Sequence, residues 1–212
     1  FLRLLLPGIL GAGAIQLNII VGTIIASFLP TGAISHLYYA DRINQLPLAL
    51  FGIALGIALL PTLSNYIKQG VSEEKINNIQ NRSVEFSLLI SLPSAVGLFI
   101  LSEPIIRILF ERGSFSSVDT YYSSQVLSLF ALGLPAYILI KVLSPSFFAR
   151  EDTKTPLYVT LICVSLNVIL SLLLISSIRE MGIALATAIS SWANVLIFYI
   201  LLKKIGNLAL IC

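Results

Sequence analysis

The sequence is poor in the residues on which soluble proteins and most enzymes depend. Only 11% of its 212 residues are charged, and it contains one His and two Cys. An ordinary soluble domain carries about 25% charged residues, so a water-soluble globule is excluded. The formal net charge of +3 excludes a nucleic-acid-binding or acidic tail. A hydrophobic share of 57% excludes a disordered chain.

The cysteines and the short catalytic motifs give no support to an enzyme. Cys163 lies in an apolar run and Cys212 ends the sequence, and neither has CxxC or Cys/His metal spacing or suggests a disulfide framework. The patterns HExxH, GxSxG, GxGxxG and Walker A are absent. We therefore expect no enzyme, no cofactor and no nucleic-acid partner.

The two ends of the sequence predict a part of a longer protein. It opens at Phe1 without an initiator Met, its only Met is Met181, and it stops at Cys212 directly after an apolar segment. The front lacks a basic region, a short apolar region and a small-residue cleavage site in succession. We therefore interpret the first apolar run as mature structure and not as a signal peptide.

The sequence consists mainly of long apolar stretches that contain no charged residue. A helix rises ~1.5 Å per residue and the hydrocarbon layer is ~30 Å thick, so about 20 apolar residues cross it. The stretches predict an all-α, polytopic transmembrane bundle of about six spanning helices, which form one membrane domain over residues 1–212. The predicted spans are 9–29, 34–67, 82–102, 120–147, 155–178 and 181–204, with an interfacial helix over 103–112.

The basic residues predict how these spans are oriented, because Lys and Arg accumulate on the cytoplasmic side. One set of loops carries Arg3, Lys68, Lys75, Arg82, Lys141, Arg150, Lys154, Lys203 and Lys204. The alternate loops carry Arg107, Arg112 and Arg179. This distribution predicts that both ends of the chain are cytoplasmic, with Lys141 snorkelling toward that surface.

Arg42 remains as a cation inside a predicted span. A charged side chain at bilayer depth costs about 2.5–3.5 kcal/mol, so it normally faces protein or a water-filled cavity. Helical neighbours point about 100° apart, so Asp41 does not automatically neutralise Arg42. The planar guanidinium suits a phosphate group, which predicts an anion-binding role. The alternative is an interfacial residue that pairs with a lipid headgroup or with Asp41.

One face of this second span is wholly polar or small. Steps of three and four residues give Ser35, Tyr38, Arg42, Gln45, Ala49, Gly52 and Gly56. Gly52 and Gly56 favour close helix packing. Pro47 removes a backbone donor and predicts a kink one turn after Arg42, which serves either as a gate or cavity wall or as a purely structural bend. His36, without a second His or Cys, is interpreted as an interfacial residue.

Polar side chains also align inside the other spans. Asn167 and Ser171 share a face of the fifth span, and Thr187 lies on a polar face of the sixth. Hydrogen bonding between helices, worth ~1 kcal/mol per contact, is one explanation. The other is a cation site, although such a site normally includes a carboxylate and none is present on these faces.

Two stretches of the sequence resemble a known family. One comprises residues 38–42 (YYADR), 46–47 (LP), 51–56 (FGIALG) and 60–64 (LPTLS), and the other is residues 148–156 (FAREDTKTP). In combination and at this span spacing, they are similar to the MurJ/MviN lipid II flippase family of the MOP exporter superfamily. The similarity extends over nearly the whole chain.

The resemblance implies a bacterial inner-membrane protein of 14 helices in two lobes around a cationic cavity. This chain would supply about helices 7–12, and its partners would be the missing N-terminal lobe and the last helices of the same protein. The implied substrate is lipid II, the undecaprenyl-pyrophosphate-linked disaccharide peptide, which is flipped among membrane lipids by alternating access for cell-wall synthesis. Arg42 matches a cavity arginine, so Arg42, Asp41, Gln45, Tyr38 and Tyr39 are the implied substrate-binding residues.

Two departures from the family pattern bear on the mechanism. Gln45 stands where many relatives have Glu. Asn167 and Thr187, with Ser171, match a sodium site of some relatives, but Gly22 and Ser171 replace its carboxylates, which leaves the coupling ion open. The alternative functions are a drug or small-cation exporter of the MOP/MATE type, another polyprenyl-pyrophosphate-linked glycan flippase, and a non-transporting scaffold.

Overall fold

The structure, a computed structural model, describes the backbone of residues 2–204 and the side chains of residues 13, 14 and 16–204. This part of the chain is helical, which confirms the all-α prediction. The elements are α1 (Leu2–Ser27), α2 (Ala33–Pro47), the π-helix η1 (Leu48–Ile53), α3 (Ala54–Lys68), α4 (Glu73–Ile100), α5 (Ser102–Phe110), α6 (Ser117–Phe148), α7 (Lys154–Ile178) and α8 (Glu180–Lys204).

The helices have the lengths that a membrane demands. Within the described residues, five are long and apolar enough to cross a bilayer: Ala33–Lys68, Glu73–Ile100, Ser117–Phe148, Lys154–Ile178 and Glu180–Lys204. A sixth, α1, is 26 residues long, and its stretch Gln16–Ser27 is apolar. The chain is therefore a polytopic bundle of about six spanning helices.

Local sequence explains several of the helix ends. Gly32 has a φ of 105° before α2, a conformation that glycine adopts without steric cost. At α6, Ser116 and Asp119 form a reciprocal capping box. α1 ends at Ser27, before the predicted end at residue 29. α4 begins at Glu73, well before the predicted span at residue 82, because its polar first turns project beyond the apolar stretch.

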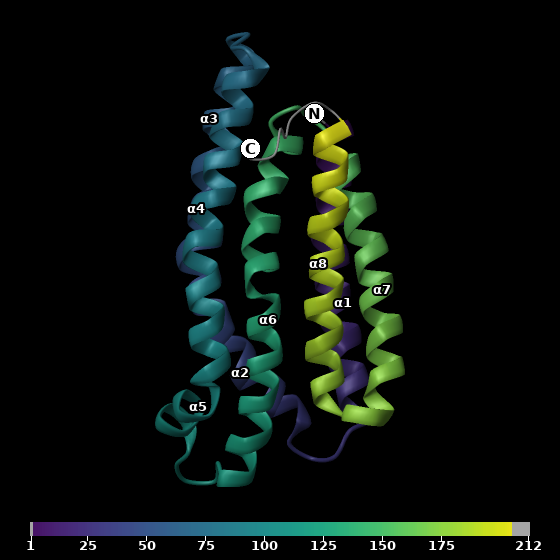
Figure 1. Ribbon diagram of the computed structural model, residues 1–212. Coiled ribbons are helices and arrows are strands. Elements are labelled where there is room, and N and C mark those ends of the chain that lie inside the picture. The colour runs from purple at the N-terminus through teal and green to yellow at the C-terminus, as the bar shows by residue number, and fades with distance from the viewer. Residues whose placement is uncertain (1, 205–212) are drawn as a thin grey trace.

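The helix α6 forms the centre of the bundle. It contacts α2, α3, α4, α5 and α8, while α7 packs mainly on α8 and α1. Figure 1 shows α3 and α4 on one side of α6, and α8, α1 and α7 on the other. The fully buried residues of α6 include Val126, Leu127, Leu134 and Ile138. The core thus follows one long helix through the bundle.

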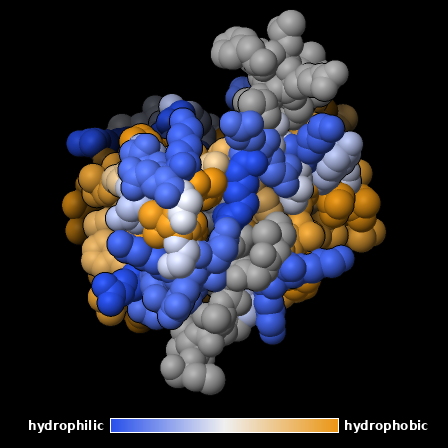
Figure 2. Space-filling model, turned by 90° about the horizontal axis from the view of Figure 1, so that it is seen from above, coloured by the Kyte–Doolittle hydropathy of each residue, from blue (hydrophilic) through white to orange (hydrophobic). Residues whose placement is uncertain are grey.

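The two ends of the bundle differ in their loops. We call the end with the start of α1 and the end of α8 the terminal end, and the opposite end, where α5 lies, the α5 end (Figure 1). Lys68, Arg150 and Lys204 lie at the terminal end, and Arg107 and Arg179 lie at the α5 end. Figure 2, a view onto the terminal end, shows a hydrophilic band across the face and hydrophobic sides.

This separation of basic residues is the one that the loop pattern predicts, and the side of the membrane that each end faces stays a prediction. The short helix α5 occupies the position expected for the interfacial helix over 103–112. The side chain of Arg3 and the residue Cys212, both part of the sequence-based interpretation, lie outside the described residues.

Candidate functional site

Arg42 lies on α2 with its side chain exposed. Its guanidinium carbon is 4.6 Å from the centre of the Tyr38 ring, a cation–π contact one turn earlier on the helix. Its Nη1 donates to Oε1 of Gln45 at 3.4 Å. No ion pair joins Arg42 to a carboxylate within the described part of the chain. The guanidinium therefore keeps donors that are free to bind an anion.

Gln45 connects Arg42 with Asp41. Its Nε2 donates a hydrogen bond to Oδ2 of Asp41, while its Oε1 accepts from Arg42. Asp41 is half-buried, and it forms no ion pair with Arg42 among the described contacts. The amide of Gln45 thus satisfies Asp41 without introducing a second negative charge beside Arg42.

The two tyrosines of the predicted site have different surroundings. Tyr38 is 53% exposed and lies beside Arg42. Tyr39 packs its ring against Phe110 at 4.7 Å and Phe115 at 5.2 Å between ring centres. Tyr39 therefore ties α2 to α5 and to the loop before α6, whereas Tyr38 belongs to the exposed polar face.

The helix leaves regular α geometry directly after Pro47. The π-helix η1 follows at Leu48–Ile53 before α3 begins. The interruption begins directly after Pro47, which lacks the backbone N–H that would bond to the carbonyl oxygen of Ile43. Both Gly52 and Gly56 face α6, where a Cβ on Gly52 would lie 3.3 Å from Cγ1 of Ile138. The interruption thus separates the Arg42 segment from a segment that is packed tightly on α6.

A cavity of about 240 Å³ lies deeper in the bundle, between α1, η1, α6, α7 and α8. Its lining includes Asn18, Lys141, Asn167, Thr187 and Asn194. The buried Oδ1 atoms of Asn18 and Asn194 have no hydrogen-bond partner among the described residues. The cavity therefore offers a few polar groups within a largely apolar lining, and Lys141, predicted to snorkel from the membrane, is one of the lining residues.

The structure brings together two of the three residues proposed for a cation site. Nδ2 of Asn167 donates to Oγ1 of Thr187 at 3.1 Å and to Oγ of Ser190 at 3.3 Å. Ser171 is buried without a partner among the described residues and contacts neither of the other two through a hydrogen bond. The cavity lining contains no carboxylate, and the Lys141 ammonium shares it, so this set fits a hydrogen-bonded helix contact better than a sodium ion.

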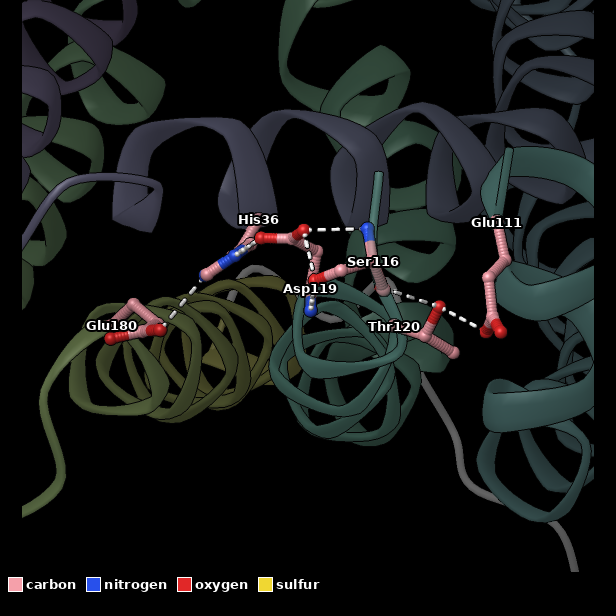
Figure 3. Close-up of polar contacts among 6 residues, drawn as sticks. All are labelled: His36, Glu111, Ser116, Asp119, Thr120 and Glu180. Atoms are coloured by element: carbon pink, nitrogen blue, oxygen red, sulfur yellow. Dashed lines mark hydrogen bonds and ion pairs between the residues drawn. The ribbon is translucent and has the colours of Figure 1, made fainter. Parts of the chain in front are cut away.

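His36 has a role that its sequence position does not reveal. His36 is not isolated, because only 5% of the residue is exposed and both ring nitrogens face carboxylates (Figure 3), while its place at the membrane interface stays a prediction. Asp119 and Glu180 are 83 and 144 residues further along the chain. No local pattern links residues at such separations, so only the fold brings them together.

Comparison with known proteins identifies the family. The sequence model described as "Lipid II flippase MurJ" matches residues 1–210. The chain belongs to the MurJ family of lipid II flippases. A Rhizobium tropici protein named "Probable lipid II flippase MurJ" is 48% identical over 98% of this chain, and a protein of the same name from Rickettsia prowazekii (strain Madrid E) is 45% identical over 91%.

Solved structures agree with this membership of the MurJ family. A structure titled "Lipid II flippase MurJ, inward closed conformation" matches 99% of this chain with a TM-score of 0.85 and 33% identity. An outward-facing MATE transporter of the MOP superfamily matches 96% of the chain with a TM-score of 0.84 at 15% identity, which shows the shared fold alone. The chain covers 43% and 45% of these structures and 38% of the two relatives.

Proposed function

We propose that the protein containing this chain flips lipid II across the bacterial inner membrane by alternating access. This chain would be one lobe, and the missing N-terminal lobe and last helices would complete the cavity. Both ends of the chain would be cytoplasmic. The lobes would rock about the substrate, so that the headgroup crosses while the undecaprenyl tail stays among the membrane lipids.

The exposed guanidinium of Arg42 carries this proposal. It lies in a helix of spanning length, it makes no ion pair with a described residue, and Tyr38 and Gln45 contact it from one turn on either side. A pyrophosphate offers oxygens in pairs to the planar donors of a guanidinium, and charge-assisted bonds of this kind contribute about 1.5–3 kcal/mol each. Asp41 and Gln45 would hold Arg42 toward the cavity.

Replacement of Arg42 tests the proposal. We expect Arg42→Ala in the complete protein, produced as the sole lipid II flippase of a bacterium, to abolish growth and to leave lipid II in the inner leaflet. Arg42→Lys keeps the charge but loses the planar fork, so partial activity is expected. Arg107→Ala is the matched control, because Arg107 lies exposed on α5 and pairs with Glu103 and Glu111.

Normal growth of the Arg42→Ala strain, with the protein present in the membrane, would contradict the proposal. A loss of growth for Arg107→Ala as well would show that the loss of an exposed arginine is sufficient for the defect. The growth defect of Arg42→Ala would then give no support to substrate binding by Arg42. Another polyprenyl-pyrophosphate-linked glycan presents the same phosphate chemistry. Chemical identification of the lipid that accumulates in the Arg42→Ala strain shows whether the substrate is lipid II or this other glycan lipid.

A drug or small-cation exporter has the same fold, as the MATE structures show. That function requires a negatively charged cavity that attracts cations. An unpaired Arg42 on the exposed polar face opposes it. Cation efflux by the complete protein, without a change in the accessibility of lipid II, would favour the exporter.

A further inference from the structure

At the α5 end, the ring of His36 joins three helices. Nδ1 lies 3.0 Å from Oε1 of Glu180 at the start of α8, and Nε2 lies 3.1 Å from Oδ1 of Asp119 in the first turn of α6. His36 itself belongs to the first turns of α2. His36 and Glu180 are 5% and 4% exposed, so water does not compete freely for the contact between them, whereas the Asp119 side chain is 31% exposed. Figure 3 shows the imidazole between the two carboxylates.

These two contacts require two protons. Each N···O contact is a hydrogen bond only when one hydrogen lies between its nitrogen and its oxygen. A neutral imidazole between two ionised carboxylates supplies one hydrogen and directs the bare lone pair of its other nitrogen at a negative oxygen. One further proton, on the ring of His36 or on the carboxyl of Glu180, completes both bonds. A buried polar contact left without its hydrogen is destabilising, because the desolvated groups gain no bond in return.

The carboxylates of Asp119 and Glu111 are held by other groups around α6. The backbone N–H and the hydroxyl of Ser116 donate to Oδ2 of Asp119 at 2.8 and 2.7 Å. The Thr120 hydroxyl donates to Oε2 of Glu111 at 2.7 Å (Figure 3). Asp119 therefore stays in place through its helix cap whether or not His36 binds it.

Among the described residues, no Lys or Arg forms an ion pair with Asp119 or Glu180, although Arg179 directly precedes Glu180 in the sequence. Arg107 on α5 pairs instead with Glu103 and Glu111, with 3.5 Å between its Nε and Oε2 of Glu111. The ring of Tyr122 on α6 stacks on the imidazole, with ring centres 5.5 Å apart and an angle of 18°. Gly32, with a φ of 105°, lies against the His36 ring and precedes α2. A Cβ at position 32 would lie 3.2 Å from the His36 ring, so the connection before α2 passes close to the cluster.

We propose that His36, Asp119 and Glu180 form a proton-binding site that fastens α2 to α6 and α8. With the additional proton bound, both contacts are closed and α2 is held at the α5 end. Without it, one contact becomes repulsive and α2 detaches from one of its two partners. The ligand of this site is a proton, and the site is built by three helices that are distant in the sequence.

The site acts on the helix that carries Arg42. Six residues separate His36 from Arg42, which is about 9 Å at ~1.5 Å per residue. Release of the start of α2 would therefore change the direction in which the Arg42 segment points, with the π-helix η1 as the next interruption of the helix. The proposal concerns the position of α2 and stands whether or not the substrate is lipid II.

Distances between spin labels test the proposal in the complete protein. Labels are attached to cysteines introduced at Ile34 of α2 and Ser177 near the end of α7, both of which are exposed, in a background in which Cys163 and Cys212 are replaced by Ala and any other cysteine is removed. We expect one short distance at pH about 5.5, where protons are abundant, and a longer or broader distribution at pH about 9, where they are scarce.

Two substitutions are expected to act in opposite directions. Glu180→Gln supplies its own N–H to Nδ1 of a neutral His36, so both bonds close without an additional proton and the short distance persists at both pH values. His36→Ala removes both contacts and leaves Glu180 buried without its partner, so the longer distance is expected throughout. If His36→Ala fails to fold, the comparison of Glu180→Gln with the unmodified protein still tests whether the pH dependence of the distance arises from this site.

A second label pair serves as an internal control. Labels at Leu132 of α6 and Leu196 of α8, both exposed, lie away from the cluster and are expected to keep one distance at both pH values. A distance between Ile34 and Ser177 that does not depend on pH would overturn the proposal. So would a Glu180→Gln variant that retains the full pH dependence. Neither result bears on the Arg42 growth test, so failure of one proposal is distinguishable from failure of the other.

Discussion

A Cβ atom on Gly56 would lie 2.9 Å from the carbonyl oxygen of Lys141. The helix α3 thus approaches the backbone of α6 more closely than any side chain at position 56 permits. Gly52, one turn earlier, lies against Ile138 in the same way, with 3.4 Å between its virtual Cβ and the Cα of Ile138. The small-residue stripe on this helix is a contact surface for α6, and in membranes such surfaces supply much of the packing energy.

The close approach predicts a large effect of a single methyl group. Gly56→Ala should lower the stability of the complete protein by about 1–3 kcal/mol, because a backbone carbonyl cannot move aside as a side chain can. The shift in unfolding temperature in detergent measures this effect. Gly97→Ala on α4 is the matched control, since nothing lies within 4 Å of its virtual Cβ.

For Gly97→Ala we expect a neutral or slightly stabilising result, because alanine is the better helix former by about 0.5–1 kcal/mol. Equal destabilisation by both substitutions would show that helix flexibility, and not contact with α6, is the reason for glycine at position 56.

The buried side-chain amide of Gln80 is predicted to stabilise the contact between α4 and α6. Gln80 of α4 is 2% exposed, donates from Nε2 to the carbonyl oxygen of Val142 at 2.9 Å and accepts from the Ser146 hydroxyl at 2.7 Å. Gln80→Leu leaves both groups without their partner, so we expect a loss of about 1–3 kcal/mol in unfolding free energy. Ser146→Ala should cost less, and the two changes should not add, because they remove the same bond.

The control for Gln80 is a serine whose bond stays within its own helix. Ser144 donates to Ile140 of α6 at 2.6 Å and joins no second helix. Ser144→Ala should therefore change the unfolding temperature little. Fully additive losses for Gln80→Leu and Ser146→Ala would contradict the shared bond.

Much of the fold and one part of the site can be predicted from the sequence, because the signals are local. Apolar runs of about 20 residues define spans, Gly32 and Pro47 mark interruptions, and Arg42 stands out as a charge within a span. These features depend on residues within a few turns of one another. The family resemblance rests on the same local stretches.

The His36 cluster and the cavity could not be predicted in this way. Glu180 lies 144 residues after His36, and its contact depends on how α2, α6 and α8 pack. Hydropathy places Glu180 only at a turn between two spans. Asn18 likewise lines the cavity because α1 packs on α7, and no periodic pattern links it to Asn167.

The turn between α6 and α7 predicts effects of opposite sign at neighbouring residues. Oδ1 of Asp152 accepts the backbone N–H groups of Lys154 at 3.1 Å and Thr155 at 3.0 Å and thereby caps α7. Asp152→Ala should cost about 1 kcal/mol. Glu151 has a φ of 59°, a left-handed conformation that glycine adopts more readily, so Glu151→Gly should be neutral or stabilise by up to about 1 kcal/mol.

Unfolding temperatures of the two variants in the same detergent check this pair. Thr153→Ala is a suitable control, because the Thr153 side chain makes no capping bond to α7. A loss of stability for Glu151→Gly comparable to that for Asp152→Ala would show that flexibility of the turn outweighs the relief of backbone strain.

The ring of Tyr38 predicts an effect on activity without an effect on stability. It lies 4.6 Å from the Arg42 guanidinium and is 53% exposed, so its removal costs little packing. An exposed cation–π contact is worth about 0.5–1 kcal/mol. If the contact orients Arg42 for its ligand, its loss would lower the affinity for that ligand by about two- to fivefold. Tyr38→Leu in the complete protein should reduce the proposed lipid II flipping by about this factor, whereas Tyr38→Phe, which keeps the ring, should retain it.

The measurement is the rate of lipid II appearance in the outer leaflet at equal protein levels. Combining Tyr38→Leu with Arg42→Ala should add nothing to the defect of Arg42→Ala alone, because the ring acts only through the guanidinium. Equal losses for Tyr38→Phe and Tyr38→Leu would instead assign the role to the Tyr38 hydroxyl, which the polar face also offers to a phosphate oxygen.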